Sequence, residues 1–194
     1  MLLKIFNITL LLAMIIVNYL ANSLPINNQT TGEISAKYEN LFTPAGLTFS
    51  IWGIIYLLLI IFIFLQFKES NTEIIHSISW LFGISSLLNI LWIYAWHYNN
   101  LHFSVLIMVL LLVSLVLINI QLKDFPNSLI KASFGIYLGW ILIAAVANIT
   151  VWLVSINWNG FGISAINWTI IMIIAGLLIS ALNAIKLNNP FILI

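Results

Sequence analysis

The 194-residue chain contains no cysteine and no arginine, and its only charged residues are six lysines and five acids. Without cysteine there is no disulfide framework, no thiolate metal site and no cysteine nucleophile. A soluble domain carries roughly 25% charged residues, whereas this chain has 6%. A soluble enzyme is therefore excluded. A nucleic-acid-binding protein is also excluded, because it needs a basic face to meet phosphates.

Apolar residues dominate what remains: 63% of the chain is hydrophobic, and the mean hydropathy is +1.15. Disordered chains are poor in apolar residues, so disorder is excluded as well. The composition therefore predicts an integral membrane protein whose main partner is the lipid bilayer.

Six apolar runs are long enough to cross a bilayer, whose hydrocarbon core of about 30 Å needs about 20 helical residues. Only the first connection, over about 25–45, is long, and it ends at Thr43-Pro44, which predicts an N-cap followed by a proline in the first helical turn. We therefore expect an all-α membrane bundle that forms a single domain over 1–194. The predicted spans are 4–24, 46–67, 75–97, 101–121, 131–155 and 162–186.

The first apolar segment also has features of a signal peptide. Lys4 precedes the apolar stretch, and small residues follow at Ala21-Asn22-Ser23. The stretch is longer than a usual signal core and contains Asn7 and Asn18, which favours a retained spanning helix.

The lysines predict the orientation, because positive residues are retained on the cytoplasmic side during insertion. With six spans and a cytoplasmic N-terminus, only Lys37 lies outside. We therefore predict that both termini are cytoplasmic. The lysines on the inner side are Lys4, Lys68, Lys123, Lys131 and Lys186.

Polar and aromatic residues recur on one face of three predicted spans. By the helical rise, Asn89, Asn148 and Trp52 each lie about 10–12 Å below the outer ends of their helices. Because an unpaired amide is costly in hydrocarbon, we expect these stripes to face the bundle interior. The stripes are Thr48, Trp52 and Tyr56; Ser85, Asn89, Trp92 and Trp96; and Trp140, Ala144, Asn148 and Trp152.

Other residues fit a purely structural role. Gly135, Gly139, Gly176 and Ser180 are small residues of the kind that packed membrane helices place between them. The inner half of the bundle offers few interior polar groups, namely Asn119, Ser180 and Asn183. The aromatic residues near helix ends fit an interfacial belt, and these are Tyr94, Trp96, Tyr98, Trp152 and Trp158.

Trp52 and Trp140 do not fit that belt, because they lie about 8 and 15 residues from the outer helix ends. No acid falls inside a predicted span, and we expect neither a catalytic nor a metal site. His76, His97 and His102 are predicted to be solvated turn residues. His97 and His102 flank one turn but lack a third ligand.

Three ordered motifs resemble the TspO/MBR family, the tryptophan-rich sensory proteins related to the mitochondrial translocator protein. The run from Thr43 to Leu58 resembles the second-helix motif PPxWxFxxxWxxLY. Leu88-Asn89-Ile90-Leu91-Trp92 matches LNxxW, and the run from Tyr137 to Asn148 matches PYxxWxxFAxxLN. The chain departs from the family at Pro44-Ala45 and at Ile136, and it adds a sixth helix to the five of that family.

The resemblance implies a TspO-like five-helix core over about 1–156, with the extra helix at about 162–186, in a bacterial cytoplasmic membrane. It implies a binding or sensory protein for a flat hydrophobic ligand, a porphyrin or haem, with no required cofactor. Degradation of porphyrin and transport of small apolar solutes are the alternatives, and a homodimer is one option for the assembly. The site residues carried over by the motifs are Trp52, Asn89, Trp140, Ala144 and Asn148.

Overall fold

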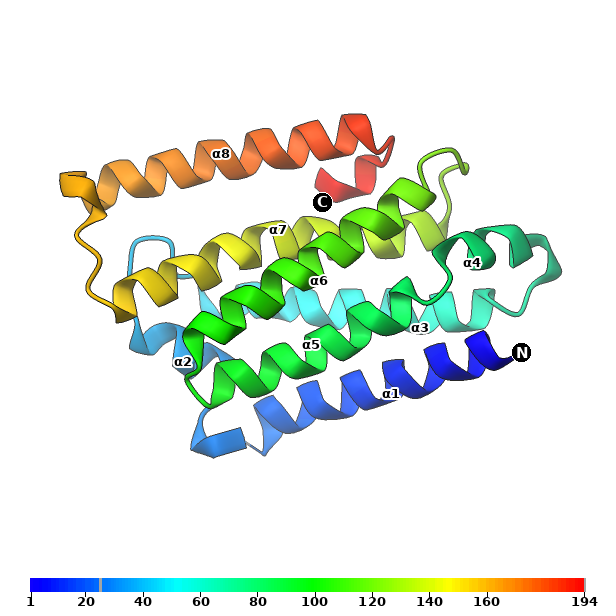
Figure 1. Cartoon of the computed structure of the whole chain (residues 1–194), viewed down its shortest axis with the longest axis horizontal. Helices are drawn as coiled ribbons and strands as arrows, with labels where there is room; N and C mark the ends of the chain where they lie inside the picture. The colour runs from blue at the N-terminus through cyan, green and yellow to red at the C-terminus, as the bar shows by residue number, and fades with distance from the viewer. Residues whose placement is uncertain (25, 194) are drawn as a thin grey trace.

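The computed structural model describes residues 1–24 and 26–193, so residue 25, at the start of the first loop, lies outside the described residues. Within these ranges the chain forms helices and no strand (Figure 1). The elements are α1 (Leu2–Ser23), η1 (Ile26–Asn28), α2 (Thr31–Lys37), η2 (Gly46–Ser50), α3 (Ile51–Leu65), η3 (Glu69–Asn71), α4 (Thr72–Ile78), α5 (Leu81–His97), α6 (Leu101–Gln121), α7 (Leu129–Ser155), η4 (Gly160–Gly162), α8 (Ala165–Lys186) and η5 (Pro190–Leu193).

Five helices close a ring in which α1 contacts α5, α5 contacts α6, α6 contacts α7, α7 contacts α3 and α3 contacts α1. The sixth long helix, α8, lies outside this ring against α7 (Figure 1). We call the end of the bundle that carries α2 the loop end, and the opposite end, which holds the N-terminus and the end of α8, the terminus end. The arrangement confirms the all-α bundle with a five-helix core and a sixth helix.

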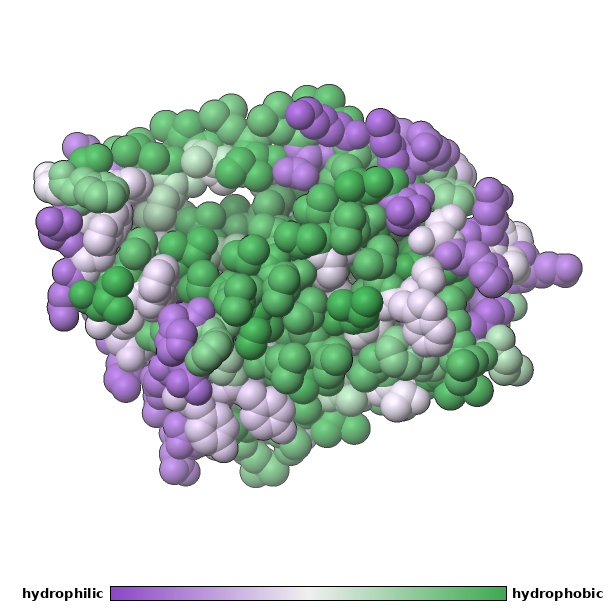
Figure 2. Space-filling model, in the orientation of Figure 1, coloured by the Kyte–Doolittle hydropathy of each residue, from purple (hydrophilic) through white to green (hydrophobic). Residues whose placement is uncertain are grey.

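The surface confirms a protein embedded in a membrane. Figure 2 shows that the sides of the helices on this face are apolar, whereas hydrophilic residues gather at the two ends. In the part of the chain that the structure describes, five helices are long and apolar enough to span a bilayer, and the bent pair α4–α5 makes a sixth. These segments agree with the six predicted spans.

The third predicted span, 75–97, is wrong in one respect, because it is not continuous. α4 and α5 meet at an angle of 58°, and Ser79 between them has a φ of 49° and a ψ of −134°. α4 buries Ile74, Ile75 and Ile78 and exposes Glu73 and His76. Such a short amphipathic helix suits the edge of the bilayer and not its apolar centre, which is why the span breaks here.

The first loop contains a helix that the sequence analysis did not anticipate. α2 begins with a capping box, in which Thr30 and Glu33 bond each other's backbone N–H groups. The predicted helix start at Thr43-Pro44 is wrong, because the Thr43 hydroxyl accepts a hydrogen bond from the Asn40 N–H (3.0 Å) and so closes a turn. The second span begins later, at Gly46.

The centre of the bundle is filled by three phenylalanines from three helices. Phe62, Phe82 and Phe134 are fully buried, with ring centroids 4.9 to 5.8 Å apart in edge-to-face geometry. Such aromatic contacts add to the stabilisation from burial. This cluster separates a polar layer at the terminus end from the aromatic residues at the loop end.

The terminus end holds more buried polar groups than the sequence analysis expected. Asn7 donates a hydrogen bond to Gln66 (3.2 Å). The Lys131 ammonium donates to the carbonyl oxygens of Lys123 and Phe125 (3.1 and 2.8 Å), and only 1% of the residue is exposed. The Asn7 and Lys131 donors are therefore paired, as the apolar surroundings require, whereas the Asn7 Oδ1 has no partner among the described residues.

Residues Leu187–Leu193, which we call the C-terminal hook, fold back from α8 onto α7. Asn189 lies buried in the bundle, where its amide donates to Asn119 (2.7 Å) and to the Lys131 carbonyl oxygen (3.0 Å). Gly135 and Gly139 were predicted to serve helix packing. Their missing Cβ atoms instead make room for the hook, since a Cβ at Gly139 would overlap the Ile192 carbonyl oxygen.

Candidate functional site

Aromatic side chains from α3, α5 and α7 converge at the loop end of the ring. The Trp52 indole lies edge-to-face against Trp140, with ring centroids 6.0 Å apart, and it stacks on Tyr56 at 5.7 Å. On the facing helix, Trp92 and Trp96 stack on each other at 5.6 Å. These rings line a small chamber, here called the aromatic chamber. Its walls are formed by Thr31, Ser35, Pro44, Phe49, Trp52, Trp92, Trp96, Trp140, Ile143, Ala144, Ala147, Asn148 and Val151.

The first loop closes the aromatic chamber at the loop end. Phe49 packs edge-to-face on Trp140, with centroids 6.4 Å apart. The Trp96 Nε1–H donates to the Thr31 carbonyl oxygen (3.2 Å), and the Asn27 amide donates to the His97 carbonyl oxygen (2.9 Å). The loop is thus a lid that these two bonds tie to the end of α5.

The burial of Trp96 and His97 distinguishes between their predicted roles. Trp96 was placed both on an interior stripe and in an interfacial belt, and its 4% exposure agrees with the stripe, because it stacks on Trp92 and bonds to the lid. His97 was predicted to be solvated, but it is fully buried, and its Nδ1 lies 2.8 Å from the Ile93 carbonyl oxygen. His76 and His102 are exposed, as predicted. The described residues contain no cluster of three metal-ligating side chains.

The two carboxamides predicted at the site are already bonded within the protein. Asn148 accepts a hydrogen bond from the Trp92 Nε1–H (2.8 Å) and donates to the Ser104 hydroxyl (2.8 Å). Asn89 accepts from the Asn18 amide (2.7 Å) and donates to the Tyr137 hydroxyl (3.2 Å). Both amides therefore join helices to each other in this state of the protein.

Three other polar atoms at the chamber and at the cavity that adjoins it are buried without a partner among the described residues, namely Trp140 Nε1, Thr31 Oγ1 and Tyr56 Oη. A buried donor without an acceptor costs about 1–3 kcal/mol. The Trp140 and Tyr56 rings both contact Trp52. These atoms are therefore the groups that a polar atom of a ligand would satisfy.

The aromatic chamber is nearly closed. Its volume is about 40 Å³, and an adjoining cavity of about 100 Å³ lies toward Asn18, Asn22 and Tyr56. The two cavities share Thr31, Phe49, Trp52 and Trp92 as walls. Pockets for small molecules usually measure about 300–1,000 Å³. A tetrapyrrole therefore enters only if the lid and the Phe49 ring move.

The structure brings four of the five predicted site residues together. Trp52, Trp140, Ala144 and Asn148 line the chamber, whereas Asn89 lies beneath it, bonded to Tyr137. Sequence reasoning missed the lid residues Thr31 and Ser35, and it missed Phe49 at the start of the second span. The capping-box pattern Thr30-x-x-Glu33 is the sequence signal that predicts α2, which we call the lid helix.

The lid helix gives a first testable prediction. The hydrogen bonds from Thr30 hold the pKa of Glu33 below its usual value of about 4.3. Because the pKa is lowered in the folded state, the capping contribution is complete at neutral pH and is lost as the pH falls through the lowered value. We expect carbonyl NMR to show Glu33 titrating below the usual value, and Thr30→Val to raise that midpoint. Because valine keeps the backbone N–H that donates to the carboxylate, an unchanged midpoint in Thr30→Val would show that the hydroxyl makes no contribution.

Comparison with known proteins gives one match. A family model described as TSPO-like protein matches residues 4–194, a range that includes α8. The searches of curated proteins and of solved structures gave no match.

Proposed function

Because the chain belongs to the family of TSPO-like proteins, we propose that it is a membrane binding and sensory protein for a flat hydrophobic ligand of the tetrapyrrole class. The ligand occupies the aromatic chamber after the lid has opened. Trp52, Trp140, Ala144 and Asn148 contact it, and Asn89 holds the floor of the site through Tyr137.

One observation carries the proposal: two indoles from separate helices meet at the loop end around a buried donor that has no acceptor. Trp52 and Trp140 present perpendicular apolar faces 6.0 Å apart, and the Trp140 Nε1–H has no partner among the described residues. Flat rings gain from stacked and edge-to-face contacts with indoles. A porphyrin carboxylate or ring nitrogen supplies the missing acceptor.

Ligand entry requires a second state, in which the lid has moved away from α5. Two hydrogen bonds tie the lid to α5, one from Trp96 to Thr31 of α2 and one from Asn27 of η1, and the Ile34 side chain of α2 is fully buried. Bonds of this kind each contribute only about 0.5–1.5 kcal/mol. A ligand that binds the open state better than the closed one therefore shifts the population toward the open state. This difference between two lid positions is the basis of a sensory role.

We also propose that both termini face the cytoplasm, which places the aromatic chamber in the outer half of a bacterial cytoplasmic membrane. The structure puts Lys4, Lys68, Lys123 and Lys186 at or next to the terminus end and Lys37 in the lid. This distribution follows the retention of positive residues on the inner side.

Titration with protoporphyrin IX in nanodiscs tests the function. We expect the double variant Trp52→Ala, Trp140→Ala to bind about 5- to 150-fold more weakly, since each lost ring contact is worth about 0.5–1.5 kcal/mol. The anisotropy of porphyrin fluorescence is the measurement, because eight tryptophans complicate protein quenching.

Trp80→Ala is the matched control. Trp80 is 44% exposed, and it packs on Phe6 at the terminus end, away from the chamber. The Trp80→Ala variant should bind protoporphyrin IX with unchanged affinity. Equal weakening in this control, or unchanged affinity in the double variant, would remove the chamber as the site.

A further inference from the structure

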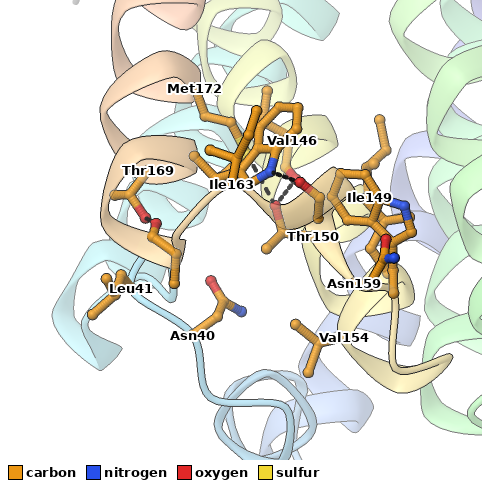
Figure 3. Close-up of a pocket in the computed structure, with 15 residues that line it drawn as sticks. Asn40, Leu41, Val146, Ile149, Thr150, Val154, Asn159, Ile163, Thr169 and Met172 are labelled. Carbon is orange, nitrogen blue, oxygen red and sulfur yellow. Dashed lines mark hydrogen bonds between the residues drawn. The ribbon is translucent and has the colours of Figure 1, made fainter.

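A large cleft that is open on one side lies outside the ring, between α7 and α8. This cleft has a volume of about 570 Å³ (Figure 3). A second cavity, of about 630 Å³, continues it at the loop end and shares Asn40, Leu41, Val154 and Ala165 with it. Figure 2 shows an opening between α8 and the rest of the bundle. The walls of the cleft are Asn40, Leu41, Val146, Ile149, Thr150, Leu153, Val154, Trp158, Asn159, Gly160, Ile163, Ala165, Trp168, Thr169 and Met172.

The cleft is built into the fold because α8 is fixed to α7 at both ends. At the terminus end the C-terminal hook packs against α7, and Gly176 lets α8 approach Ile143. At the loop end the Trp168 Nε1–H donates to the Gly160 carbonyl oxygen (2.8 Å), and the Trp158 and Trp168 rings lie 5.2 Å apart. The turn at Gly160, with a φ of 63°, holds the start of α8 away from α7.

The polar groups along the walls need no partner from an occupant. The Thr150 hydroxyl donates to the Val146 carbonyl oxygen (2.9 Å) within its own helix. The Thr169 hydroxyl does the same to Ala165 (2.9 Å). Because these donors are satisfied, a hydrocarbon can lie against them without leaving a buried polar group unpaired. The sides of the cleft therefore suit an apolar chain.

Polar residues gather at only one end of this space. Glu39, Asn40 and Thr43 line the outer cavity at the loop end, and Asn159 lies at the mouth of the cleft. The deeper walls, at Val146 and Met172, are apolar apart from the satisfied hydroxyls. An occupant that matches this gradient has one polar end and a long apolar tail.

The polarity of the space favours a lipid over another helix. The cleft of about 570 Å³ continues into the outer cavity of about 630 Å³. A hydrocarbon chain fits the apolar walls at Val146 and Met172, and a polar headgroup fits the end at Asn159. A transmembrane helix of a second copy, which is apolar along its whole length, matches this gradient less well.

From these observations we propose that the cleft between α7 and α8 binds one phospholipid of the surrounding bilayer. One acyl chain lies between Val146, Ile149 and Met172, and the headgroup lies at the loop end beside Asn159. This site is separate from the aromatic chamber, because α7 stands between them and contributes different residues to each.

The test places the protein in nanodiscs of phosphatidylcholine that contain a small fraction of an analogue with a diazirine near the end of one acyl chain. After illumination, we expect mass spectrometry to find the label on α7 and α8 wall residues around Val146 and Met172. Thr169→Phe and Val146→Phe fill the cleft and should each reduce this labelling at least tenfold.

Ile170→Phe is the matched control, because it adds the same ring to α8 at a side chain that is 49% exposed. It should keep the labelling of the wild-type protein. Gel filtration shows that each variant remains folded, and native mass spectrometry of the wild-type protein should find one retained phospholipid, which gives a second readout without any substitution.

Three results would overturn the proposal. The first is that the wall residues are still labelled in both Thr169→Phe and Val146→Phe. The second is that a diazirine fatty acid labels the walls and the phosphatidylcholine analogue does not. The third is a dimer that is cross-linked through the cleft. Porphyrin binding, measured in the same nanodiscs, should be unchanged in Thr169→Phe. The proposal for the cleft and the proposal for the aromatic chamber are therefore tested independently.

Discussion

Gly139→Val is expected to release the C-terminal hook from α7. A Cβ at this position overlaps a backbone atom of the hook, the Ile192 carbonyl oxygen, which has no flexible side chain to turn away. Overpacking of a close contact costs about 1–3 kcal/mol. At the upper end of this range, the equilibrium between the docked and released hook shifts by roughly a hundredfold.

The absence of cysteine makes this release measurable. Ile192→Cys places one thiol at a site that is 3% exposed, and its rate of reaction with a maleimide reports the released fraction. We expect the rate to rise by at least tenfold when Gly139→Val is added. Gly53→Val is the control, because nothing lies within 4 Å of a Cβ there. A slow rate in the Gly139→Val protein would show that the hook adapts without release.

Asn89→Leu is expected to destabilise the bundle by about 2 kcal/mol. Asn89 lies between three helices, since it accepts a hydrogen bond from Asn18 of α1 and donates one to Tyr137 of α7. Leucine removes both bonds and leaves the Tyr137 hydroxyl, which is fully buried, without its partner. The lost bonds and the stranded hydroxyl together account for this cost. Reversible unfolding in mixed micelles measures it.

A double-mutant cycle separates the bond from the packing. Tyr137→Phe added to Asn89→Leu removes the stranded hydroxyl, so the double variant should be no less stable than Asn89→Leu alone. Asn183→Ala, on α8 outside the ring, serves as a distant comparison whose effect should simply add. Additive losses from Asn89→Leu and Tyr137→Phe would show that the two side chains are not coupled.

The spans were predictable from the sequence because hydrophobic length alone determines them. Six runs of sufficient length appear as α1, α3, α4–α5, α6, α7 and α8. The break at Ser79 was not predictable, since no proline or glycine marks it. Trp80, the residue after the break, packs on Phe6 of α1 with ring centroids 4.9 Å apart, and the local sequence does not reveal this tertiary contact.

The composition of the chamber was predictable, but its hydrogen bonding was not. Helical spacing places Trp52, Trp140, Ala144 and Asn148 on inward faces, and the structure brings them to one cavity. The partners of each amide depend on how neighbouring helices are rotated and shifted along their axes. Local periodicity does not contain that information, and for this reason the Asn148–Trp92 and Asn89–Tyr137 bonds had to come from the structure.

Buried polar residues at the terminus end were missed for a related reason. Lys131 was treated as a free charge on the inner side, yet its ammonium caps two carbonyl oxygens of the preceding turn. Asn189 follows the last span and carries no periodic signal, although it is completely buried. In both cases the buried side chain bonds to, or lies in, a segment without regular secondary structure. Sequence periodicity does not predict burial in such segments.

The space that Gly135 and Gly139 leave on α7, here called the notch, is filled by the C-terminal hook. It has a consequence for the order in which the helices pack during synthesis. α7 leaves the ribosome about fifty residues ahead of the segment that fills this notch. Until α8 has crossed and turned back, the backbone of α7 is covered there only by lipid. Closure of the bundle must therefore wait for late translation, and a substitution in the hook would act as a defect in biogenesis as well as in the finished protein.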